Sequence, residues 1–469
     1  MADDSHLALQ PAAQLARLIR GKELSSRELL EVYLRRIERL NPALNAVVTL
    51  DAEGATAAAR RADELTAAGA ATGPLHGLPM TVKDAIEVGG LRSTGGAEEL
   101  SEHVPAADAP VVARLRRAGA VVMGKTNVPR WSGDIQTYNS LFGVTNNPWD
   151  LSRTTGGSSG GPAAAVAAGL TSFETGTDIG GSIRIPSSFC GICGHKPSYG
   201  VVSQRGYLDR VGGGVTDADI NVFGPLARSV DDLELLLGVI AGPDDDDAVG
   251  WKLDLPPARH REIRDYRVGL WLDDPACQVD AAALGVLREA ADALADAGAH
   301  VSQSRPPLDL QDVDGLFGSL LLAAISVSVK RPVGEVLAGN HLDWLVLNEK
   351  RAALRRVWAE WFRDFDVLLC PVLPMLPFPH DTEGTINDRY VIVNGRSRPQ
   401  SQTLSWTGLV GVAYLPSTVV PVGMANDLPV GIQVVGPYLE DRTALFVARQ
   451  LAELRGGIIP PPIALAHQT

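Results

Sequence analysis

The stretch Thr154-Thr-Gly-Gly-Ser-Ser-Gly-Gly161 is the most informative part of this chain. A second glycine-rich stretch, Gly176-Thr-Asp-Ile-Gly-Gly-Ser-Ile-Arg-Ile-Pro186, follows it. Each presents a serine, Ser158 or Ser182, among glycines that let the backbone approach a ligand closely. A serine in such a loop can act as a nucleophile, while neighbouring N–H groups face the charge that develops on a substrate oxygen. None of the nine histidines lies in either stretch, so a base must come from elsewhere.

Lys83 is the best candidate for that base. Seven of the 42 basic residues are lysines, and a lysine, unlike an arginine, can lose its proton when it is desolvated. Lys83 follows the run Leu78–Val82, which is typical of a buried strand. The end of such a strand is a place where the pKa of a lysine can be depressed. From position alone, a surface lysine paired with a carboxylate is an equally good interpretation.

Together these segments resemble the amidase signature family. The resemblance covers about residues 25 to 455, and several independent motifs occur in the family's order. Besides the segments already quoted, they are Gly124–Pro129, Phe142-Gly, Asn146–Trp149, Phe189–Pro197, Leu415–Gly423 and Leu428–Gly436. The resemblance implies an α/β fold with a mixed twisted central sheet that is covered by helices on both faces.

The resemblance also implies the roles of the residues in the two loops. Ser182 would attack the substrate carbonyl, and Ser158 would bridge it to Lys83, the ultimate base. The peptide bond between Gly157 and Ser158 would be cis. The backbone N–H groups that would hold the oxyanion are those of Ile179, Gly180, Gly181 and Ser182.

Further residues are expected to support the reaction or to bind substrate, with no metal and no cofactor. Asp178 and Arg184 would form an ion pair that shapes the loop, although two ordinary surface charges are the alternative. The other supporting residues are Ser159 and Thr177. The segment between two motifs, residues 130–139, should line the acyl pocket through Trp131, Ser132, Gly133 and Tyr138. A far wall could come from Phe317, Trp344, Trp358, Trp361 and the segment around Trp406, although aromatics at helical spacing belong more often to a core than to a pocket.

The sequence therefore predicts an amidase, a hydrolase of linear amide C–N bonds that could also act on carbamates and esters. The apolar character of the expected pocket favours a hydrophobic or aryl amide or a carbamate (urethane). The alternative is the amidase subunit of a glutamine-dependent tRNA amidotransferase, which would need a partner chain. A catalytically silent binding protein is a third alternative, against which the presence of Lys83, Ser158 and Ser182 argues.

For other motifs in the chain, a structural interpretation is better than a catalytic or metal-binding one. Gly156–Gly160 fits G-x-S-x-G, but a nucleophile elbow must follow a strand and the preceding residues are typical of a loop. Gly160-Gly-Pro lacks the lysine of a phosphate-binding loop. Cys190-Gly-Ile-Cys193 has no second ligand pair, so two small buried residues are expected. Asp244–Asp247 is interpreted as a solvated loop, and His76 and His195 as structural residues.

Composition and charge limit the expected cellular compartment and binding partners. The formal net charge of −13 argues against nucleic acid and anionic membranes, which both attract basic patches. We therefore expect a small-molecule amide or carbamate as the ligand, with no nucleic acid and no membrane, and a monomer or homodimer. Four cysteines form no disulfide framework, and the acidic N-terminus is unlike a secretory signal, so a cytoplasmic protein is expected.

Strand and helix patterns interleave throughout the chain, which favours one domain over residues 1–469. Residues 1–70 should form a helical segment that packs on a catalytic α/β core over residues 71–460. Ser25-Ser-Arg-Glu28 has capping-box spacing and opens a helix. A β–α–β unit over residues 80–82, 109–118 and 121–123 predicts a parallel strand pair. Helices are also expected over 52–68, 161–169, 231–240, 281–297, 442–454 and most of 314–364, and strands over 267–272, 300–302 and 367–370 and near Val419 and Ile432.

Overall fold

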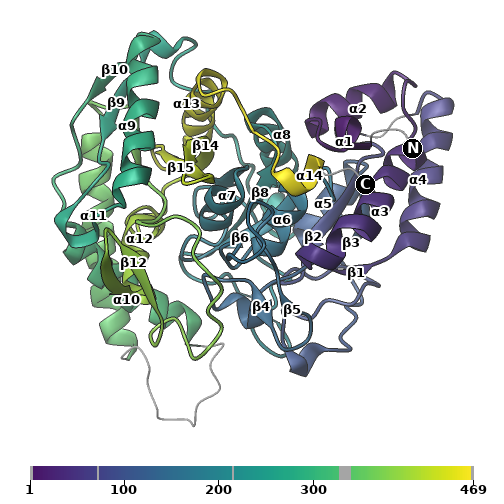
Figure 1. The fold of residues 1–469 in the computed structure, drawn as a ribbon, viewed down its shortest axis with the longest axis horizontal. Coiled ribbons are helices and arrows are strands. Elements are labelled where there is room, and N and C mark those ends of the chain that lie inside the picture. The colour runs from purple at the N-terminus through teal and green to yellow at the C-terminus, as the bar shows by residue number, and fades with distance from the viewer. Residues whose placement is uncertain (1–3, 71–72, 214–215, 327–339, 466–469) are drawn as a thin grey trace.

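A mixed sheet of eight strands runs through the centre of the molecule in the computed structural model, which describes residues 4–70, 73–213, 216–326 and 340–465 (Figure 1). The strand order is β10-β9-β11-β15-β14-β7-β8-β6. In that order the strands are His300–Ser302, Arg267–Leu270, Val367–Pro371, Leu428–Val435, Ser417–Ala425, Cys193–Lys196, Val222–Ala227 and Glu174–Asp178. The pairs β10/β9 and β9/β11 are parallel and the other pairs are antiparallel, which confirms the predicted mixed sheet.

Helices cover both faces of this sheet. Gln433 of β15 accepts a hydrogen bond from Arg184 of α7 (Arg184–Cys190), and α6 (Gly160–Ala167) packs beside α7. Successive side chains of a strand point to opposite faces, so Ile432 and Val434 face away from α7 and belong to the main core. The helices α8 (Val230–Ile240), α9 (Ala281–Asp296) and α13 (Asp441–Leu454) pack against the strands there.

A smaller sheet of three strands carries Lys83. Its order is β1 (Val47–Leu50), β3 (Val121–Thr126) and β2 (Pro79–Lys83). β2 and β3 are parallel and are joined through α5 (Pro110–Arg117), which confirms the predicted β–α–β unit. Lys83 is the last residue of β2, and β2 packs beside β6 of the large sheet. The smaller sheet thus places Lys83 next to the two glycine-rich loops.

The first 70 residues are mostly helical, as expected, but they also supply β1, which was not predicted. Four residues are too few for a strand to be told from a loop by periodicity. The helices are α1 (Asp4–Ala8), α2 (Ala12–Arg20), α3 (Ser26–Leu44) and α4 (Ala52–Ala67), and they gather at one end of the molecule (Figure 1). The predicted capping box is present: the Ser25 hydroxyl accepts from the Glu28 N–H, and Glu28 accepts from the Ser25 N–H.

The opposite end of the molecule contains α9, α10 (Leu310–Ile325) and α11 (His341–Trp361) (Figure 1). The interruptions expected at Pro332 and Gly339 lie outside the described residues. The remaining strands and α-helices are β4 (Tyr138–Asn139), β5 (Gly143–Val144), β12 (Tyr390–Val393), β13 (Arg396–Pro399), α12 (Ser405–Gly411) and α14 (Pro462–Leu465). The 3-10 helices span Glu98–Leu100, Arg130–Ser132, Asp247–Val249, Ile263–Asp265, Pro275–Cys277 and Gln400–Thr403.

Arg36 of α3 joins distant parts of the chain. Its side chain is buried, and the guanidinium donates to the carbonyl oxygens of Ala168 and Gly169, which directly follow α6. It also donates to the carbonyl oxygen of Ala464 in α14 at 2.9 Å. One buried cation therefore connects α3, the end of α6 and the C-terminal helix.

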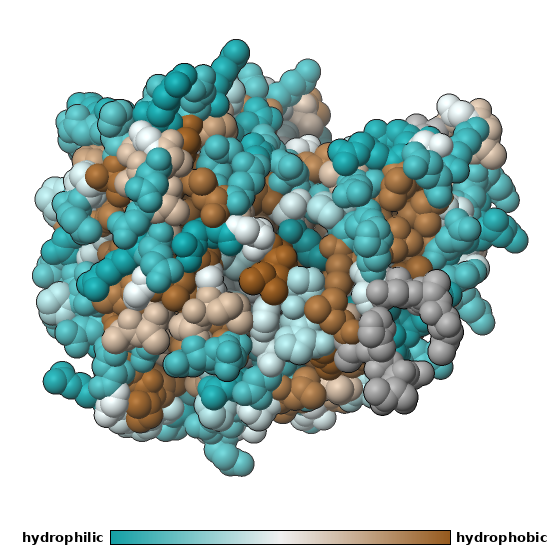
Figure 2. All heavy atoms as spheres, turned by 45° about the horizontal axis from the view of Figure 1, so that its top comes forward, coloured by the Kyte–Doolittle hydropathy of each residue, from teal (hydrophilic) through white to brown (hydrophobic). Residues whose placement is uncertain are grey.

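Hydrophilic residues predominate on the face drawn in Figure 2, where apolar residues gather in separate groups. Across the described ranges, no helix is both long enough and apolar enough to cross a membrane. The expected cellular compartment stays a prediction.

Candidate active site

The Lys83 amine lies among three hydroxyl groups that come from two separate segments. Its Nζ is 2.7 Å from Ser158 Oγ, 2.9 Å from Ser159 Oγ and 2.7 Å from Thr177 Oγ1. Thr177 belongs to β6, while Ser158 and Ser159 directly precede α6. The fold therefore brings together Lys83 and three of the residues predicted to act with it.

Lys83 is fully buried, so it is not the surface lysine that position alone allowed. In the part of the chain that the structure describes, no carboxylate forms an ion pair with it. Burial holds the pKa of Lys83 well below its ordinary value, although the charges of Asp178 and Glu174 act in the opposite direction. A buried amine with hydroxyl partners and no bound counter-ion is suited to be neutral before it accepts a proton.

The loop that carries Ser158 is held by close backbone packing. The peptide bond between Gly157 and Ser158 is cis, as expected. A Cβ on Gly157 would lie 2.6 Å from the carbonyl oxygen of Asp134, so a larger residue does not fit there. The N–H of Ser159 donates to the carbonyl oxygen of Ser182 at 3.1 Å. This hydrogen bond ties the loop of Ser158 to the loop of Ser182.

The Ser182 loop is shaped by an ion pair between Asp178 and Arg184. Both side chains are fully buried, and Arg184 Nη2 lies 2.8 Å from Asp178 Oδ1. The alternative of two surface charges is therefore wrong. Burial acts to raise the pKa of Asp178, but the charge and hydrogen bonds of Arg184 bring it below its ordinary value. Arg184 also donates to the Thr407 carbonyl and to Gln433, which fixes the loop to the sheet.

The expected oxyanion donors divide into two groups. The N–H of Gly181 donates to Asp178 Oδ1 at 2.8 Å, so this group is not free for a substrate oxygen and departs from the expectation. The reason is that the Asp178 carboxylate turns back into its own loop. Within the described ranges, the N–H groups of Ile179, Gly180 and Ser182 have no acceptor. Ser182 itself is 8% exposed, which leaves its hydroxyl narrow access from outside.

The residues predicted to bind substrate make contacts away from Ser182. The backbone N–H of Trp131 donates to the Gly95 carbonyl. A Cβ on Gly133 would meet only the carbonyl oxygen of Arg130. Tyr138 donates its hydroxyl to Asp134, which is paired with the buried Arg389. None of these contacts involves Ser182. The prediction that Trp131, Gly133 and Tyr138 bind substrate thus gains no geometric support.

Tyr207 is a site residue that sequence reasoning missed. Burial raises its pKa to about 12, while the hydroxyls of Ser132 and Thr177 act to lower it. Tyr207 thus lies between the predicted residue Ser132 and the Thr177 hydroxyl that contacts Lys83. It belongs to no motif, and a long-range bridge to Ile86, which follows β2, brings it there. No sequence signal identifies such a residue.

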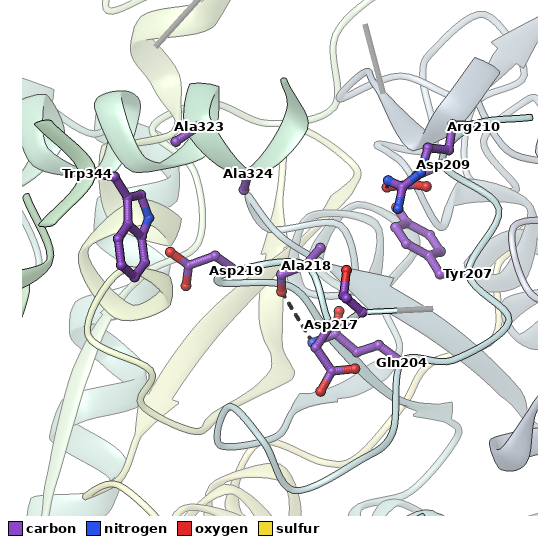
Figure 3. Close-up of a pocket in the computed structure, with 11 residues that line it drawn as sticks. Gln204, Tyr207, Asp209, Arg210, Asp217, Ala218, Asp219, Ala323, Ala324 and Trp344 are labelled. Carbon is purple, nitrogen blue, oxygen red and sulfur yellow. Dashed lines mark hydrogen bonds and ion pairs between the residues drawn. The ribbon is translucent and has the colours of Figure 1, made fainter. Parts of the chain in front are cut away.

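Tyr207 also lines a cavity of about 210 Å³ (Figure 3). Its polar walls include Asp209, Arg210 and Asp217, and Ala323 and Ala324 of α10 close one side. Asp219 is neutralised by Arg351, whose Nη1 lies 2.7 Å from Asp219 Oδ1. The cavity is therefore more polar than the aromatic wall expected from the sequence.

The aromatic residues proposed for the far wall have different positions. Phe317 lies near the Ser182 loop, because a Cβ on Gly180 would be 3.7 Å from its ring, and Trp344 lines the Tyr207 cavity. Trp358 and Trp361 pack in the core against Phe362. Trp406 is fully buried and donates to the Cys277 carbonyl. Trp358, Trp361 and Trp406 are therefore core residues.

The residues of the remaining motifs have contacts that are typical of structural roles. Cys190 and Cys193 are buried free thiols, as expected, and burial raises the pKa of each. His195 contacts Asp441 at 3.1 Å and Thr418 at 2.9 Å, and His76 contacts Thr66 at 2.9 Å. Asp244 and Asp246 are paired with Arg205 at the surface. Among the described elements, no strand leads into Gly156–Gly160, which argues against a nucleophile elbow there.

Comparison with known proteins agrees with the fold and the motifs. The Amidase family model matches residues 28–344 and 320–445. A glutamyl-tRNA(Gln) amidotransferase subunit of Roseiflexus sp. (strain RS-1) is 34% identical over 468 residues, 91% of this chain and 92% of that protein. The structure of 6-aminohexanoate cyclic dimer hydrolase complexed with substrate has a TM-score of 0.78 at 29% identity, covering 98% of this chain and 100% of that one. The glutamyl-tRNA(Gln) amidotransferase subunit from Thermotoga maritima has a TM-score of 0.75 at 26% identity, covering 93% and 95%.

These relatives correct one expectation. Two of them are named as subunits of a tRNA amidotransferase, so the expectation of a monomer or homodimer that meets only a small molecule and has no link to nucleic acid is wrong. Net charge was a poor guide because it describes one chain by itself, whereas a subunit works beside other chains. Since the family model and the relatives cover most of its length, the chain belongs to the amidase signature family and is an amidase, an enzyme that cleaves amide C–N bonds.

Proposed function

We propose that this amidase works through an acyl-enzyme on Ser182, with Ser158 and Lys83 as its proton relay. The observation that supports the relay most directly is the 2.7 Å contact between the buried Lys83 amine and Ser158 Oγ. A neutral amine has two N–H donors and one lone pair, whereas Lys83 has three hydroxyl partners. One hydroxyl must therefore donate to the amine. In the proposed relay, Ser158 is the hydroxyl that donates to the amine and accepts the proton of Ser182.

In the first step, Ser182 Oγ forms a bond to the substrate carbonyl carbon. The Ser182 proton passes to Ser158, and the Ser158 proton passes to Lys83, which becomes an ammonium. The negative charge on the carbonyl oxygen would be held by the N–H groups of Ile179, Gly180 and Ser182. Each well-placed donor of this kind lowers the barrier by about 3 kcal/mol.

In the second step, the carbonyl re-forms and the C–N bond breaks. Lys83 returns its proton through Ser158 to the departing nitrogen, so the amine leaves neutral and Lys83 is again uncharged. Water then attacks the Ser182 ester with the same relay as base, which releases the carboxylic acid and restores the serine. In a carbamate ester, cleavage of the C–N bond along the same path would release the amine and leave a carbonate ester on Ser182. Its hydrolysis by water would then release the alcohol and CO2 and restore the serine.

For the biological role, we propose first the amidase subunit of a glutamine-dependent tRNA amidotransferase. Relatives of that name match this chain over 91% of its length, which supports this role. The chemistry fits, because cleavage of a primary carboxamide by the steps above releases ammonia. The role requires a partner chain that takes the ammonia and holds the tRNA.

The second candidate is hydrolysis of an apolar or aryl amide or carbamate, and one observation favours it. A Cβ on Gly180 would lie 3.7 Å from the Phe317 ring and 4.0 Å from Leu404 Cδ1. The space over an expected oxyanion donor is therefore bounded by apolar side chains. Such surfaces favour an apolar substrate group over the charged ends of glutamine.

A substrate panel distinguishes the two roles. Glutamine, a 4-nitroanilide and an aryl carbamate would be compared by kcat/KM, with ammonia release measured for glutamine. The amidotransferase role predicts that glutamine is the best substrate, and the apolar role predicts the reverse order. The part-buried Leu404 supplies a matched variant, because Leu404→Ala should lower kcat/KM for the anilide more than for glutamine if the apolar role holds.

The nucleophile is tested separately from the substrate. A fluorophosphonate should label Ser182, as located by peptide mapping, and Ser182→Ala should abolish both labelling and turnover. A label on another residue, or full turnover by Ser182→Ala, would contradict the acyl-enzyme proposal whichever substrate is preferred.

A further inference from the structure

Glu174 is a fully buried carboxyl group that the reaction described above does not use. It is the first residue of β6, three positions before Thr177. Its Oε1 accepts from Thr126 Oγ1 at 2.8 Å, and its Oε2 accepts from the Thr175 N–H at 2.8 Å. Thr126 is directly opposite Lys83 in the parallel pair of β2 and β3, so the two side chains emerge on the same side of that sheet. Glu174 therefore approaches the Lys83 environment through Thr126.

The charged groups around Glu174 are otherwise paired. Asp178, on the same strand, is bound by Arg184 of α7. Lys125 of β3 lies 4.0 Å from Asp84 Oδ1. In the described part of the chain, Glu174 forms no ion pair at this range with any cation. It is thus the acidic group near Lys83 whose charge is not already taken up by a partner.

The reaction makes this arrangement matter, because Lys83 becomes a buried ammonium during each turnover. A buried cation is expensive unless a negative charge lies near it. The hydroxyls of Ser158, Ser159 and Thr177 solvate the ammonium but carry no charge. Resting on the proposed role of Lys83 as base, we propose that Glu174 is a positioning residue whose negative charge compensates the Lys83 ammonium and so determines how strongly Lys83 binds its proton.

The electrostatics of the site agree with this assignment. Burial raises the pKa of Glu174 to about 7, while the hydroxyls of Thr81 and Thr126, the Thr175 N–H and the charge of Lys125 act to lower it. The charge of Glu174 in turn acts to raise the pKa values of both Lys83 and Lys125. The two groups therefore titrate together: an ionised Glu174 favours the Lys83 ammonium, and a protonated Glu174 favours the neutral amine.

The test is the pH dependence of fluorophosphonate labelling at Ser182, which needs no knowledge of the substrate. Glu174→Gln keeps the size of the side chain and an acceptor for Thr126, but it removes the charge. The Lys83 amine then loses its proton more readily, so the acid limb of the rate profile should move to lower pH by about 1 unit. The plateau should also fall, because a less basic amine is a weaker general base.

Thr126 supplies an independent variant in case Glu174→Gln does not fold. Thr126→Val removes one hydrogen bond from the ionised carboxylate, which favours the protonated acid. We expect a smaller movement of the acid limb in the same direction, and Thr126→Ser should restore the wild-type position. A variant that only loosens the fold would lower the plateau without moving the limb.

The outcomes separate this inference from the proposed function. An acid limb at the wild-type pH in folded Glu174→Gln, or in Thr126→Val where Glu174→Gln does not fold, would overturn the role of Glu174. Lys83→Met is measured in parallel. If it retains the wild-type labelling rate, the relay itself is wrong, whereas a silent Lys83→Met with an unshifted Glu174→Gln rejects the inference alone.

Discussion

Lys83 and Lys125 are two fully buried lysines on neighbouring strands, yet their surroundings differ. Lys125 is in register with Val82, the residue before Lys83. It lies 4.0 Å from Asp84 Oδ1, 2.9 Å from Ser93 Oγ and in contact with the Ile86 carbonyl. Among the described residues, the Lys83 amine forms hydrogen bonds only with hydroxyl groups. Lys125 has a counter-ion and one carbonyl partner, and Lys83 has neither among the described residues.

The difference shows what makes a buried lysine available as a base. Burial lowers the pKa of Lys125 to about 8 against the opposing charge of Asp84, so this amine remains largely protonated at neutral pH. Burial also holds the pKa of Lys83 well below its ordinary value, and this amine has no ion-pair partner among the described residues. The surroundings thus predict a structural cation at Lys125 and a proton acceptor at Lys83.

The largest expected effect is the loss of turnover when Lys83 is replaced. Lys83→Met and Lys83→Arg should each lower kcat/KM by about 10³-fold or more, because neither side chain can accept a proton at neutral pH. The measurement is turnover of the best panel substrate, with circular dichroism to verify folding and the exposed Lys350→Met as control. An active Lys83→Arg enzyme would remove the distinction between the two lysines.

The next effect falls on stability. Lys125→Met leaves Asp84 buried without its cation, which should lower the free energy of unfolding by about 3–5 kcal/mol. Chemical denaturation measures this loss, and the double variant Lys125→Met/Asp84→Asn should recover much of it because no unpaired charge remains. Turnover per folded molecule should stay within a few-fold of wild type. A large specific loss of turnover in the stable double variant would place Lys125 in the chemistry instead.

The smallest effect is on the pH dependence of stability. Between pH 8 and about 10, Lys125 in the unfolded chain keeps its proton while the folded protein has lost it. The unfolded state then binds more protons, so stability rises with pH across this window by up to about 1.4 kcal/mol per unit for this group. Denaturation series should show a shallower rise for Lys125→Met/Asp84→Asn than for wild type. Equal slopes would mean that Lys125 titrates at its ordinary pH in the folded protein.

How far the sequence could predict this arrangement depended on whether residues sit in motifs. The place of Lys83 was predictable because the strand before it and the glycine loops of Ser158 and Ser182 are local signals. Its lack of a counter-ion was not, since Lys83-Asp84 and Lys125 are far apart in the chain and only the strand register shows which lysine Asp84 accompanies. Glu174 lies just before a motif, but its side-chain partner Thr126 comes from another sheet.

Other differences arose from contacts that no local pattern encodes. Gly181 belongs to a motif, yet its N–H is taken by Asp178, which depends on how the loop folds back. Tyr207 reaches the site through a bridge to Ile86. The aromatic residues of the helical segment looked alike in sequence, but Phe317 faces the Ser182 loop while Trp358 lies in the core. A helical pattern indicates which residues are apolar, not which of them line a pocket.

Arg36 has a practical consequence for producing this protein. Its guanidinium holds the carbonyl groups at the end of α6 and also the Ala464 carbonyl near the end of the described chain. Shortening the chain before Ala464 would take one acceptor from a buried cation and loosen the far end of the helix that follows the loop of Ser158. If a trimmed or tagged preparation has reduced activity, loss of the Arg36–Ala464 hydrogen bond is the first cause to test. A C-terminal purification tag should follow a linker, so that α14 keeps its packing.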